Sequence, residues 1–553
     1  MARILGASGR RATRLRGFLD RFRLPEPDPV PYVPGETRIF PAVWRLALLG
    51  FAGSFAVLLG GSQETSPFTS NGIHGSWYFG IAPTPQIQGQ TIAPGSNLFI
   101  SLVLVYAGMV LMMRAWLGVA KLTSRHPGIP VRKLVPIFVL WMLPLLVIAP
   151  LFSRDAYSYA TQGEMMSRGI NPYVYPPSTI GIGNINPWIT TVDTLWRDST
   201  SPYGPAFLGI DGFIVTLTGH SPLVTIIGLR LMAVVGTVLM GVYLPRLARS
   251  YGYDGASAFV LSVMNPLILL HLVGGAHNDA LMLGLLAAGL ATARRGHPVL
   301  GIVLCTIGAG VKIPAIVGVV YIGWYWLGDD VDRRRRIWPV AAALGIAVVA
   351  MEAISEAMGL GWGWISGLSN PDAVRSWMDP PTAVGLYAGK FVQAVGLGDH
   401  SHVILSAARG LGLLLAVAIS ARLLWKSRPE TAVRALGLTL LAMVVLGPVV
   451  QPWYLAWGVV VLATVATGRI RLLVVTLSCC ASFLGLPGGA QLLRSLRAAN
   501  PLLIAGGVLA LAFVCALLLG PRVRVGLASR SRRGSAAEVE SLALEDEVSE
   551  VVA

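Results

Sequence analysis

The sequence predicts an all-α polytopic membrane protein, and three observations lead to this prediction. Of the 553 residues, 54% are apolar and only 13% are charged, whereas a soluble globular protein carries roughly 25% charged residues. The apolar residues gather in about fourteen runs, most of them close to the ~20 residues that cross a hydrocarbon core as a helix. These runs do not alternate apolar with polar residues, which excludes a transmembrane β-barrel.

We expect membrane-spanning helices over fourteen ranges in chain order. They are 42–61, 96–118, 134–152, 222–244, 256–273, 279–293, 298–311, 313–327, 337–356, 402–424, 432–448, 453–467, 470–486 and 501–519. The seventh and eighth runs also fit one broken helix, so the expected count is about 13–15. Because the first run begins some way into the chain, after a Pro-rich stretch, it is predicted to be a retained anchor and not a cleaved signal peptide.

The Lys and Arg residues predict the orientation of the chain. Roughly 30 of the 43 basic residues fall on one side of the predicted spans, which by the positive-inside rule is the cytoplasmic side. Both termini are therefore expected in the cytoplasm. We interpret the net charge of +16 as topology and contact with anionic lipids, and not as nucleic-acid binding. The predicted organisation is a basic tail over 1–41, a transmembrane domain over 42–520 and a disordered cytoplasmic tail over 521–553.

The long loops are predicted on the outer side of the cytoplasmic membrane. They cover residues 62–95, 153–221 and 357–401. Long ordered loops often carry function. The second loop begins with Arg154-Asp155 directly after a helix, and a carboxylate at that position must be hydrated or paired. An interfacial charge pair and a functional site are both open interpretations. Within this loop, residues 203–218 predict a short helix lying in the membrane interface.

Three short polar motifs interrupt the apolar sequence at outer turns. They are Gly275-Ala276-His277-Asn278-Asp279, Lys312-Ile313-Pro314 and Gln451-Pro452-Trp453-Tyr454. Each alone is explained as well or better by an ordinary turn. Ionisable residues at membrane depth are a functional hypothesis by default. Because Asp155, His277, Asp279, Lys312 and Gln451 all map to the same membrane face, they predict a shared cavity.

Taken in order along the chain, these motifs resemble those of a known family. Arg154-Asp155, Asn171-Pro172-Tyr173, Tyr203-Gly204-Pro205, His277-Asn278-Asp279, Lys312-Ile313-Pro314 and Gln451-Pro452-Trp453-Tyr454 are the motifs concerned. They resemble those of the actinobacterial polyprenol-phosphate-mannose-dependent α-1,6-mannosyltransferases, which are membrane glycosyltransferases of the GT-C class. The resemblance covers roughly residues 40–520. It does not separate the paralogues that start the mannan chain from those that extend it.

The resemblance implies a GT-C-type bundle with long periplasmic loops bearing short interfacial helices. It implies an enzyme that extends the α-1,6-mannan backbone of lipomannan and lipoarabinomannan on the outer face of the membrane. Polyprenyl-phosphate mannose would be the donor and a lipid-anchored α-1,6-mannoside the acceptor. In such enzymes a carboxylate of the first long outer loop acts as the base, and Asp155 matches that position.

The residues themselves fit an inverting displacement. A β-linked donor that gives an α-linked product needs one displacement, with a base for the acceptor 6-hydroxyl. Asp155 is the candidate base, and Arg154 is expected to keep it ionised. The departing phosphate needs positive charge. Lys312 is the first candidate for this role, followed by Arg154 and Arg375, while His277 either donates to the phosphate or orients a neighbour.

A further set of polar and aromatic residues is predicted to bind the sugars. It comprises Tyr157, Glu164, Asn171, Tyr173, Tyr203, Asn278, Asp279, Gln451, Trp453 and Tyr454. The prenyl chain is expected in a groove between helices that opens to lipid. Since no spaced set of carboxylates or histidines demands a metal, we expect no cofactor, with Asp279 as the alternative metal ligand.

Two other functions remain open at this stage. A transporter or flippase for lipid-linked sugars would also have many spans with buried charges, but transporters bind near the midplane between repeated halves. Here the polar residues gather on one face beside long loops. Within the same enzyme class, another prenyl-phosphate sugar, such as arabinose or glucose, is the second alternative.

Overall fold

The structure, a computed structural model, confirms the all-α prediction. It describes residues 40–62, 66, 68, 76–77, 82–83, 96–181, 187–328, 331–367 and 379–484. In these ranges the chain is mainly helical, and the one sheet pairs two antiparallel two-residue strands, β1 (Ser76–Trp77) and β2 (Ala82–Pro83). Six helices in the described part are long and apolar enough to cross a membrane. The predicted span 501–519, the predicted tails over 1–39 and 521–553, and Arg375 lie outside the described residues, whereas residues 40 and 41 of the predicted N-terminal tail already belong to the first helix.

The helices follow one another along the chain as follows. The longer ones are α2 (Phe40–Gly61), α3 (Ser96–Arg125), α4 (Val135–Leu146), α5 (Asp155–Ser167), α7 (Pro205–Leu217), α8 (Pro222–Ser250), α9 (Gly255–Ser262), α10 (Asp279–Arg294), α11 (Pro298–Val311), α12 (Ile316–Tyr325), α13 (Ile337–Ala357), α15 (Pro380–Ala394), α16 (Ser401–Lys426), α17 (Ala432–Leu446), α18 (Leu455–Ala463) and α19 (Gly468–Phe483). The short ones are η1 (Val131–Lys133), η2 (Pro177–Gly181), α6 (Pro187–Thr191), η3 (Thr194–Trp196), η4 (Ile268–Val273), η5 (Ile313–Ala315), α14 (Gly363–Gly367), η7 (Pro429–Thr431) and η8 (Pro452–Tyr454).

Each predicted span from 42–61 to 470–486 contains a helix in its described residues. Several begin with proline at the first helical positions, as α7, α8 and α11 do, where the missing N–H has no partner to lose and φ is already helical. The predicted span 256–273 is not continuous. It consists of α9 and the π-helical segment η4, and π-helical turns are frequent at functional sites.

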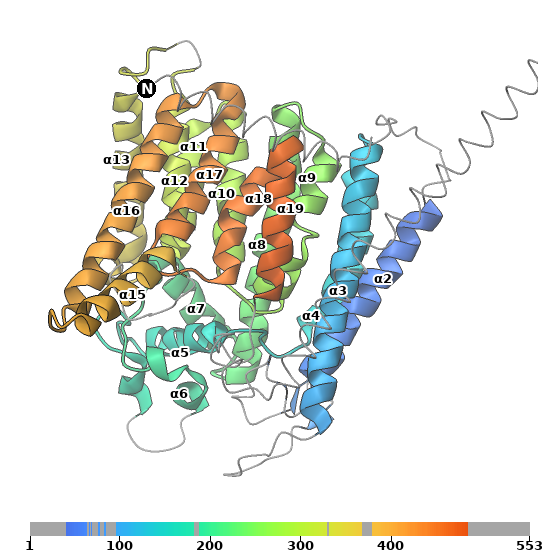
Figure 1. Ribbon diagram of the computed structural model, residues 1–553, viewed down its shortest axis with the longest axis horizontal. Coiled ribbons are helices and arrows are strands. Elements are labelled where there is room, and N and C mark those ends of the chain that lie inside the picture. The colour runs from blue at the N-terminus through green and yellow to red at the C-terminus, as the bar shows by residue number, and fades with distance from the viewer. Residues whose placement is uncertain are drawn as a thin grey trace, which may run out of the picture.

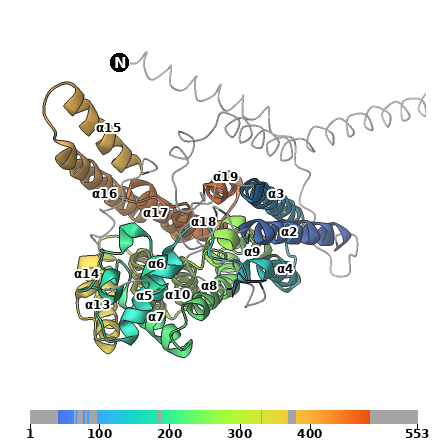
Figure 2. The same cartoon turned by 90° about the horizontal axis from the view of Figure 1, so that it is seen from below.

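The long helices stand side by side, and α5, α6 and α7 lie together at one end of the bundle (Figure 1). We call this end the loop face. Seen from below in Figure 2, the loop-face helices cover the central helices, while α15 and α16 project to one side. The segment 205–217 is helical, as predicted, and packs against α5. The structure thus places the long 153–221 segment as a layer across the ends of the spanning helices.

Two helical hairpins turn back at the loop face. In the first, α11 and α12 are joined by η5, and the Cβ position of Gly318 lies 2.8 Å from the Cys305 sulfur, so the two helices pack antiparallel. The prediction left open whether this region is one broken helix, and the structure shows two. Lys312 is extended (φ −153°, ψ 126°) and precedes Ile313-Pro314, which ends α11 and starts the turn. In the second hairpin, η8 joins α17 to α18 in the same way.

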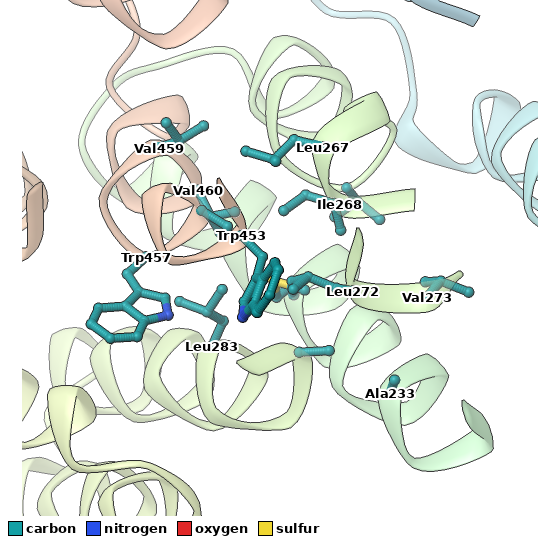
Figure 3. Packing of buried hydrophobic residues seen from close by; sticks show 14 of the residues in the cluster. Ala233, Leu267, Ile268, Leu272, Val273, Leu283, Trp453, Trp457, Val459 and Val460 are labelled. Carbon is teal, nitrogen blue, oxygen red and sulfur yellow. The ribbon is translucent and has the colours of Figure 1, made fainter. Parts of the chain in front are cut away.

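The centre of the molecule is a closely packed apolar core around η4, α10 and α18. Figure 3 shows Leu272 next to the indole of Trp453, with Leu283 of α10 near it, and Leu267 on the side of Val459 and Val460. Glycine permits a close crossing between α8 and α10. A Cβ on Gly236 would lie 2.3 Å from backbone atoms of Ala280, and one on Gly284 would lie 2.5 Å from the Gly236 carbonyl oxygen. Small residues at such crossings let helix backbones approach closely in membranes.

Candidate active site

A cavity of about 630 Å³ opens between the loop-face layer and the hairpins. One part is polar and is lined by Asp155, Ser158 and Gln162 of α5 together with residues from Trp196 to Tyr203. The other part is a corridor between α12, α16 and α17. Its walls are mainly apolar and include Val317, Val320, Leu413, Ala416, Val417, Leu424 and Val444. Lys312, Gln451, Trp453 and Tyr454 line the cavity as well, so Asp155, Lys312 and Gln451, three of the five residues predicted to share a cavity, meet in one space.

Asp155 begins α5, and its position is fixed by local structure. The Ser153 hydroxyl accepts a hydrogen bond from the Asp155 N–H at 3.0 Å, which satisfies one free N–H of the first turn. Phe152, three residues earlier, has φ of 64°, and Ala276, next to His277, has φ of 55°. Non-glycine residues in this left-handed region cost about 1–3 kcal/mol each and concentrate at functional sites. The two strained segments adjoin through the bond from Leu151 N–H to the Gly274 carbonyl (3.1 Å).

A buried arginine supports these segments from behind. Arg230 of α8 is only 2% exposed, and its guanidinium donates to three backbone carbonyls. The acceptors are Leu146 at 2.9 Å, Gly274 at 3.0 Å and Val273 at 3.3 Å. Carbonyls at helix ends lack partners within the helix. Arg230 therefore ties the end of α4 and the end of η4 to α8, and so fixes the backbone that leads to His277.

His277 lies between Asp155 and an aromatic ring. Its Nδ1 is 3.6 Å from Asp155 Oδ2 and 3.4 Å from the Tyr159 hydroxyl. Its ring stacks on Trp453 with the centroids 4.1 Å apart and an interplanar angle of 25°. The imidazole is completely buried, whereas the Asp155 side chain is 20% exposed. His277 therefore contacts the back of the carboxylate and of Trp453, which both line the cavity.

The Lys312 ammonium is held in place by a carboxylate and two rings. Both oxygens of Asp279 accept from Lys312 Nζ, at 2.8 and 2.9 Å. Trp457 Nε1 donates to the same carboxylate at 2.6 Å. Lys312 Nζ also lies 4.3 Å from the centre of the Tyr454 ring, within the range of a cation–π interaction. Asp279 is fully buried, but Lys312 keeps 12% of its side chain exposed and lines the cavity.

The pKa of Asp155 is raised to about 6, mainly because burial disfavours the charged form. The Ser153 hydroxyl and the charge of Lys312 act in the opposite direction. We expected Arg154 to keep this carboxylate ionised, and the structure differs. Among the described residues, Arg154 makes no hydrogen bond or ion pair with Asp155, and Lys312, more than 150 residues later in the chain, is the cation that stabilises the carboxylate.

The predicted site residues fall into three groups. Asp155, Lys312, Tyr203, Gln451, Trp453 and Tyr454 line the cavity. His277, Asp279 and Asn278 lie directly behind it, with Asn278 accepting a hydrogen bond from Tyr159 (3.4 Å). Arg154, Tyr157, Glu164, Asn171 and Tyr173 are not among the residues that line it. The Tyr173 hydroxyl donates to the Tyr203 carbonyl at 2.6 Å, and Asn171 accepts from the Tyr173 N–H. The contacts of Asn171 and Tyr173 therefore support the fold of the loop.

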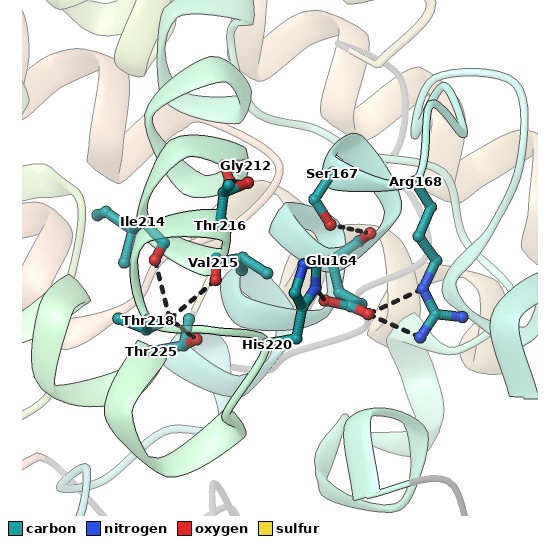
Figure 4. Close-up of polar contacts among 10 residues, drawn as sticks. All are labelled: Glu164, Ser167, Arg168, Gly212, Ile214, Val215, Thr216, Thr218, His220 and Thr225. Atoms are coloured by element: carbon teal, nitrogen blue, oxygen red, sulfur yellow. Dashed lines mark hydrogen bonds and ion pairs between the residues drawn. The ribbon is translucent and has the colours of Figure 1, made fainter.

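Glu164 takes part in a separate polar cluster that joins α5 to the start of α8 (Figure 4). Its carboxylate is 2% exposed and lies 2.6 Å from Arg168 and 2.7 Å from His220 Nδ1. His220 has φ of 57° in the turn between α7 and α8. These contacts fasten the C-terminal part of α5 to α7 and α8. We predicted Glu164 as a sugar ligand, and the structure places it away from the cavity lining.

Several residues of the site were not predicted. Ser158 and Gln162 line the cavity on the same helix as Asp155, and Trp196 lines it too. Asp379 is fully buried at the start of α15, where its Oδ1 accepts from the Val450 N–H of the turn that leads to Gln451. Burial raises the pKa of Asp379 to about 7. A hydrophilic residue in a long polar loop gives no sign of its burial, so only the spacing of Asp155, Ser158 and Gln162 offered a signal.

A metal ion has no obvious set of ligands here. Within the described ranges, no group of three or more His, Cys, Asp or Glu side chains is placed to hold one. Asp279, the alternative metal ligand considered above, has its oxygens bonded to Lys312 and Trp457.

Comparison with known proteins identifies the chain's relatives. One family model, described as alpha-(1→6)-mannopyranosyltransferase, N-terminal domain, matches residues 47–328. A second, described as MptB C-terminal domain, matches residues 381–520. Alpha-(1→6)-mannopyranosyltransferase A of Mycobacterium tuberculosis is 32% identical over 443 residues, which cover 76% of this chain and 80% of the relative. Alpha-(1→6)-mannopyranosyltransferase B of Corynebacterium glutamicum is 31% identical over 437 residues, 72% of each chain. No solved structure matches.

A helical membrane bundle with a carboxylate at the mouth of an apolar corridor, and relatives that are mannopyranosyltransferases, together define a membrane-embedded glycosyltransferase. The two family models cover most of the described chain, and the resemblance noted in the sequence is confirmed. The chain belongs to the α-(1→6)-mannopyranosyltransferase family.

Proposed function

We propose that the protein transfers mannose from polyprenyl-phosphate mannose to a growing α-1,6-mannan chain of lipomannan or lipoarabinomannan, with Asp155 as the general base. The observation that supports this proposal is the shape of the cavity. A single space joins the carboxylate of Asp155 to an apolar corridor inside the helix bundle. A donor with a long hydrocarbon chain and a sugar phosphate at one end needs both environments within one site.

The apolar corridor suits the prenyl chain. Its walls come from α12, α16 and α17, and include Val320, Ala416, Val417 and Val444. At the far end the Tyr321 hydroxyl and Thr439 Oγ1 lie 3.1 Å apart. Burial of apolar surface supplies about 25 cal/mol per Å², so a chain lying here would contribute to donor affinity. Lys312 marks the boundary between the corridor and the polar part, where the donor phosphate would lie.

The proposed reaction is one inverting displacement. Asp155 accepts the proton of the acceptor 6-hydroxyl while its oxygen forms the new bond to the anomeric carbon. The bond from that carbon to the phosphate oxygen breaks, and the electron pair leaves with the lipid phosphate. Lys312 lies next to this developing charge. Because Asp279 holds the ammonium from behind and itself accepts a hydrogen bond from Trp457, the ammonium needs little reorganisation during the reaction.

The placement of the protein in the membrane is part of the proposal. We place the loop face on the outer side of the cytoplasmic membrane, with both termini in the cytoplasm, because the basic loops lie at the opposite ends of the spans. The acceptor would be a lipid-anchored α-1,6-mannoside, and no nucleic acid would take part. We also propose that transfer needs no metal ion, since the Asp279 carboxylate is already bonded to Lys312 and Trp457.

The test is mannose transfer by the detergent-purified protein from synthetic polyprenyl-phosphate mannose to a short α-1,6-mannoside. Asp155→Asn should lower the rate of transfer at least about 100-fold, as expected for loss of a general base. Asp198→Asn, an exposed loop residue outside the cavity lining, is the matched control and should keep the wild-type rate. EDTA should leave the wild-type rate unchanged, and the product should carry the α linkage.

Each alternative has its own outcome. Full activity of a folded Asp155→Asn protein would remove Asp155 from the base role. Loss of activity in EDTA, restored by a divalent metal ion, would contradict metal independence. A wild-type protein that moves lipid-linked mannose across liposome bilayers, and transfers none to the acceptor, would be a flippase. Faster transfer from arabinosyl or glucosyl prenyl phosphate would identify a different donor sugar.

A further inference from the structure

Helix α5 presents a line of three polar side chains to the cavity. Asp155, Ser158 and Gln162 are spaced i, i+3 and i+7, and all three line it. With 3.6 residues per turn, residues at this spacing lie on one face of a helix. At a rise of 1.5 Å per residue, Ser158 lies about 4.5 Å and Gln162 about 10.5 Å along the helix axis from Asp155. The line therefore extends well beyond the reacting atoms.

Ser158 has an unsatisfied, buried hydroxyl in the part of α5 that lines the cavity. The residue is 3% exposed, and its Oγ has no hydrogen-bond partner in the described part of the chain. Serine in a helix often bonds the carbonyl four residues earlier, as Thr161 of the same helix does with Tyr157 at 2.9 Å. An unpaired buried hydroxyl costs free energy. A ligand that brings a hydroxyl group next to Ser158 would remove this cost.

Gln162 is held so that its amide N–H groups are free to donate. The side chain is 3% exposed, and its Oε1 accepts a hydrogen bond from Ser201 Oγ at 2.8 Å. Ser201 is itself fully buried and accepts from the Tyr203 N–H at 3.2 Å. With the oxygen engaged, the NH₂ group supplies the remaining hydrogen bonds. The loop that carries Ser201 therefore orients Gln162 in the cavity wall.

A second segment of the cavity lining is also suited to sugar. Trp196, Ser199 and Thr200 line the cavity as well. Indole rings offer a flat apolar face with a polar edge, and hydroxyl side chains both donate and accept. The prenyl corridor lies on the other side, between α12, α16 and α17. A hydroxyl-rich ligand thus fits between α5 and the Trp196 loop, and a hydrocarbon chain fits the opposite side.

We propose that Ser158, Gln162 and Trp196 bind the acceptor mannan chain, with Ser158 contacting its terminal mannose and Gln162 contacting the next mannose. This inference rests on the proposed function, in which Asp155 takes the proton of the acceptor 6-hydroxyl. The separation of about 6 Å between Ser158 and Gln162 along the helix axis is comparable with the length of one sugar in a chain. Gln162 then makes the enzyme prefer an acceptor with at least two mannoses.

The experiment compares acceptors of different length. Transfer to methyl α-mannoside, to the α-1,6-linked mannobioside and to the mannotrioside is measured with each variant under saturating donor. Gln162→Ala should lower kcat/KM for the bioside about 10-fold more than for the monosaccharide, as expected for one lost hydrogen bond. Ser158→Ala should lower kcat/KM for all three acceptors to a similar degree. The KM for the donor should not change in either variant.

A matched control and a second readout keep the outcomes separate. Ser167→Ala changes the same residue type on the same helix, but Ser167 bonds only the Glu164 carbonyl of its own helix and lies outside the cavity lining, so its kinetics should match the wild type. Binding of the bioside, measured by saturation-transfer NMR, should weaken in Gln162→Ala and recover in part in Gln162→Asn. Ser201→Ala should shift the acceptor preference in the same direction as Gln162→Ala.

Different results would overturn the acceptor subsite and the proposed function. An equal loss for all acceptor lengths in Gln162→Ala, or a raised donor KM with unchanged acceptor kinetics, would overturn the subsite. A wild-type protein that binds the bioside through Gln162 yet transfers no mannose would contradict the proposed function and leave the subsite standing. A wild-type protein that transfers mannose with no preference between monosaccharide and bioside would overturn the inference and leave the function intact.

Discussion

Opposing electrostatic effects act on the pKa of Asp155. Burial in the cavity wall raises its pKa to about 6, while the Ser153 hydroxyl and the charge of Lys312 lower it. Its place in the first turn of α5 also favours the ionised form, since the N-terminal end of a helix is positive. A general base works best when its pKa lies near the working pH. The site therefore holds a carboxylate that is more basic than ordinary aspartate and still ionised at neutral pH.

The raised pKa predicts the pH dependence of transfer. The base must be deprotonated, so kcat/KM should fall about 10-fold per pH unit below the Asp155 pKa of about 6 and level off above it. The measurement is a pH profile of initial rates between pH 4.5 and 8.5 with the bioside acceptor, and the remaining activity of Asp155→Asn should lose this dependence.

Asp379 provides the control for this profile because its pKa is raised to about 7 and it bonds the turn leading to Gln451. The transition near pH 6 should persist in Asp379→Asn. A profile that instead loses its transition in Asp379→Asn, and keeps it in Asp155→Asn, would assign the titration to Asp379.

The buried pair of Lys312 and Asp279 predicts a stability effect that is separable from activity. Removing one member leaves a buried charge without its partner, which costs about 3–5 kcal/mol. Lys312→Met should therefore lower the melting temperature of the detergent-solubilised protein. The double variant Lys312→Met, Asp279→Asn should recover much of this loss, because neither charge remains. Differential scanning fluorimetry provides the measurement.

Transfer activity separates the two roles of Lys312. If its ammonium stabilises the donor phosphate, the double variant should stay inactive although it is folded. Recovery of transfer together with stability would show that Lys312 acts only as the counter-ion of Asp279.

The sequence located some of these residues and missed others for a physical reason. Lys312, Asp279 and Gln451 interrupt apolar segments of the sequence, and a polar residue within an apolar segment is easy to recognise. Ser158, Gln162 and Asp379 lie in segments that are already polar, where nothing marks a residue as buried. Trp457 has the reverse problem, because it lies within an apolar helix and resembles any core residue. Its hydrogen bond to Asp279 joins residues 178 positions apart.

At the level of helices, the contact between α8 and α10 controls the position of the site. Gly236 and Gly284 bring the two backbones together, and α10 begins at Asp279, directly before the point of closest approach at Ala280 and Leu281. Arg230, on α8 less than two turns before Gly236, holds the carbonyls that precede His277. A shift of α8 relative to α10 therefore displaces both sides of the site.

Gly236→Val should lower both the melting temperature and the rate of transfer. The new side chain would meet the Ala280 backbone, which lies 2.3 Å from the Cβ position and cannot move like a flexible side chain. Overpacking of this kind typically costs about 1–3 kcal/mol. Gly345→Val on α13 is the control, because no atom lies within 4 Å of its Cβ position. Equal melting temperatures for both variants would contradict a tight crossing at Gly236.

Helix positions were predictable from the sequence because the membrane imposes a length and a composition. The positions at which helices break could not be predicted from the sequence. The π-helical segment η4 follows α9 in a run that reads as one span, and Lys312-Ile313-Pro314 fits a kink as well as a turn. Which of the two occurs depends on the neighbouring helices that satisfy the free backbone groups, and that information is not local.

Considered as a whole, the molecule has one cavity with a polar part and an apolar part, which the proposed function assigns to two substrates. The polar part of the cavity faces the loop layer, and the apolar corridor passes between α12, α16 and α17. This division was predicted only in outline, as a groove between helices and a site on one membrane face. Which helices form the groove depends on how distant spans pack, and α12 and α16 lie about 90 residues apart in the chain.

Blocking the corridor should affect only donors with long chains. Ala416 is 2% exposed and lines the corridor, so Ala416→Trp would fill much of the space there. We expect KM for a donor with a long prenyl chain to rise about 10-fold or more, as for the loss of a few buried methylene groups. KM for a donor with a two-isoprene chain should change little. Steady-state kinetics with the two synthetic donors provide the measurement.

The control is Leu414→Trp, which introduces the same indole side chain two residues away. Leu414 is 69% exposed and lies outside the cavity lining, so KM for both donors should stay at the wild-type value. An equal rise in KM for the long and the short donor in Ala416→Trp would show that the corridor does not hold the chain.

The two hairpins that end in Lys312 and Gln451 have a consequence for the surrounding membrane. Their second helices, Ile313–Tyr325 and Pro452–Ala463, are about 20 and 18 Å long at 1.5 Å per residue. The hydrocarbon layer is about 30 Å thick, so these turns end roughly 10 Å short of full depth. We therefore expect Lys312 and Gln451 to lie below the level of the neighbouring lipid headgroups. In the proposed function, the donor then needs no lifting out of the bilayer, whereas the mannan chain must descend to the site, and bilayer thickness sets how far.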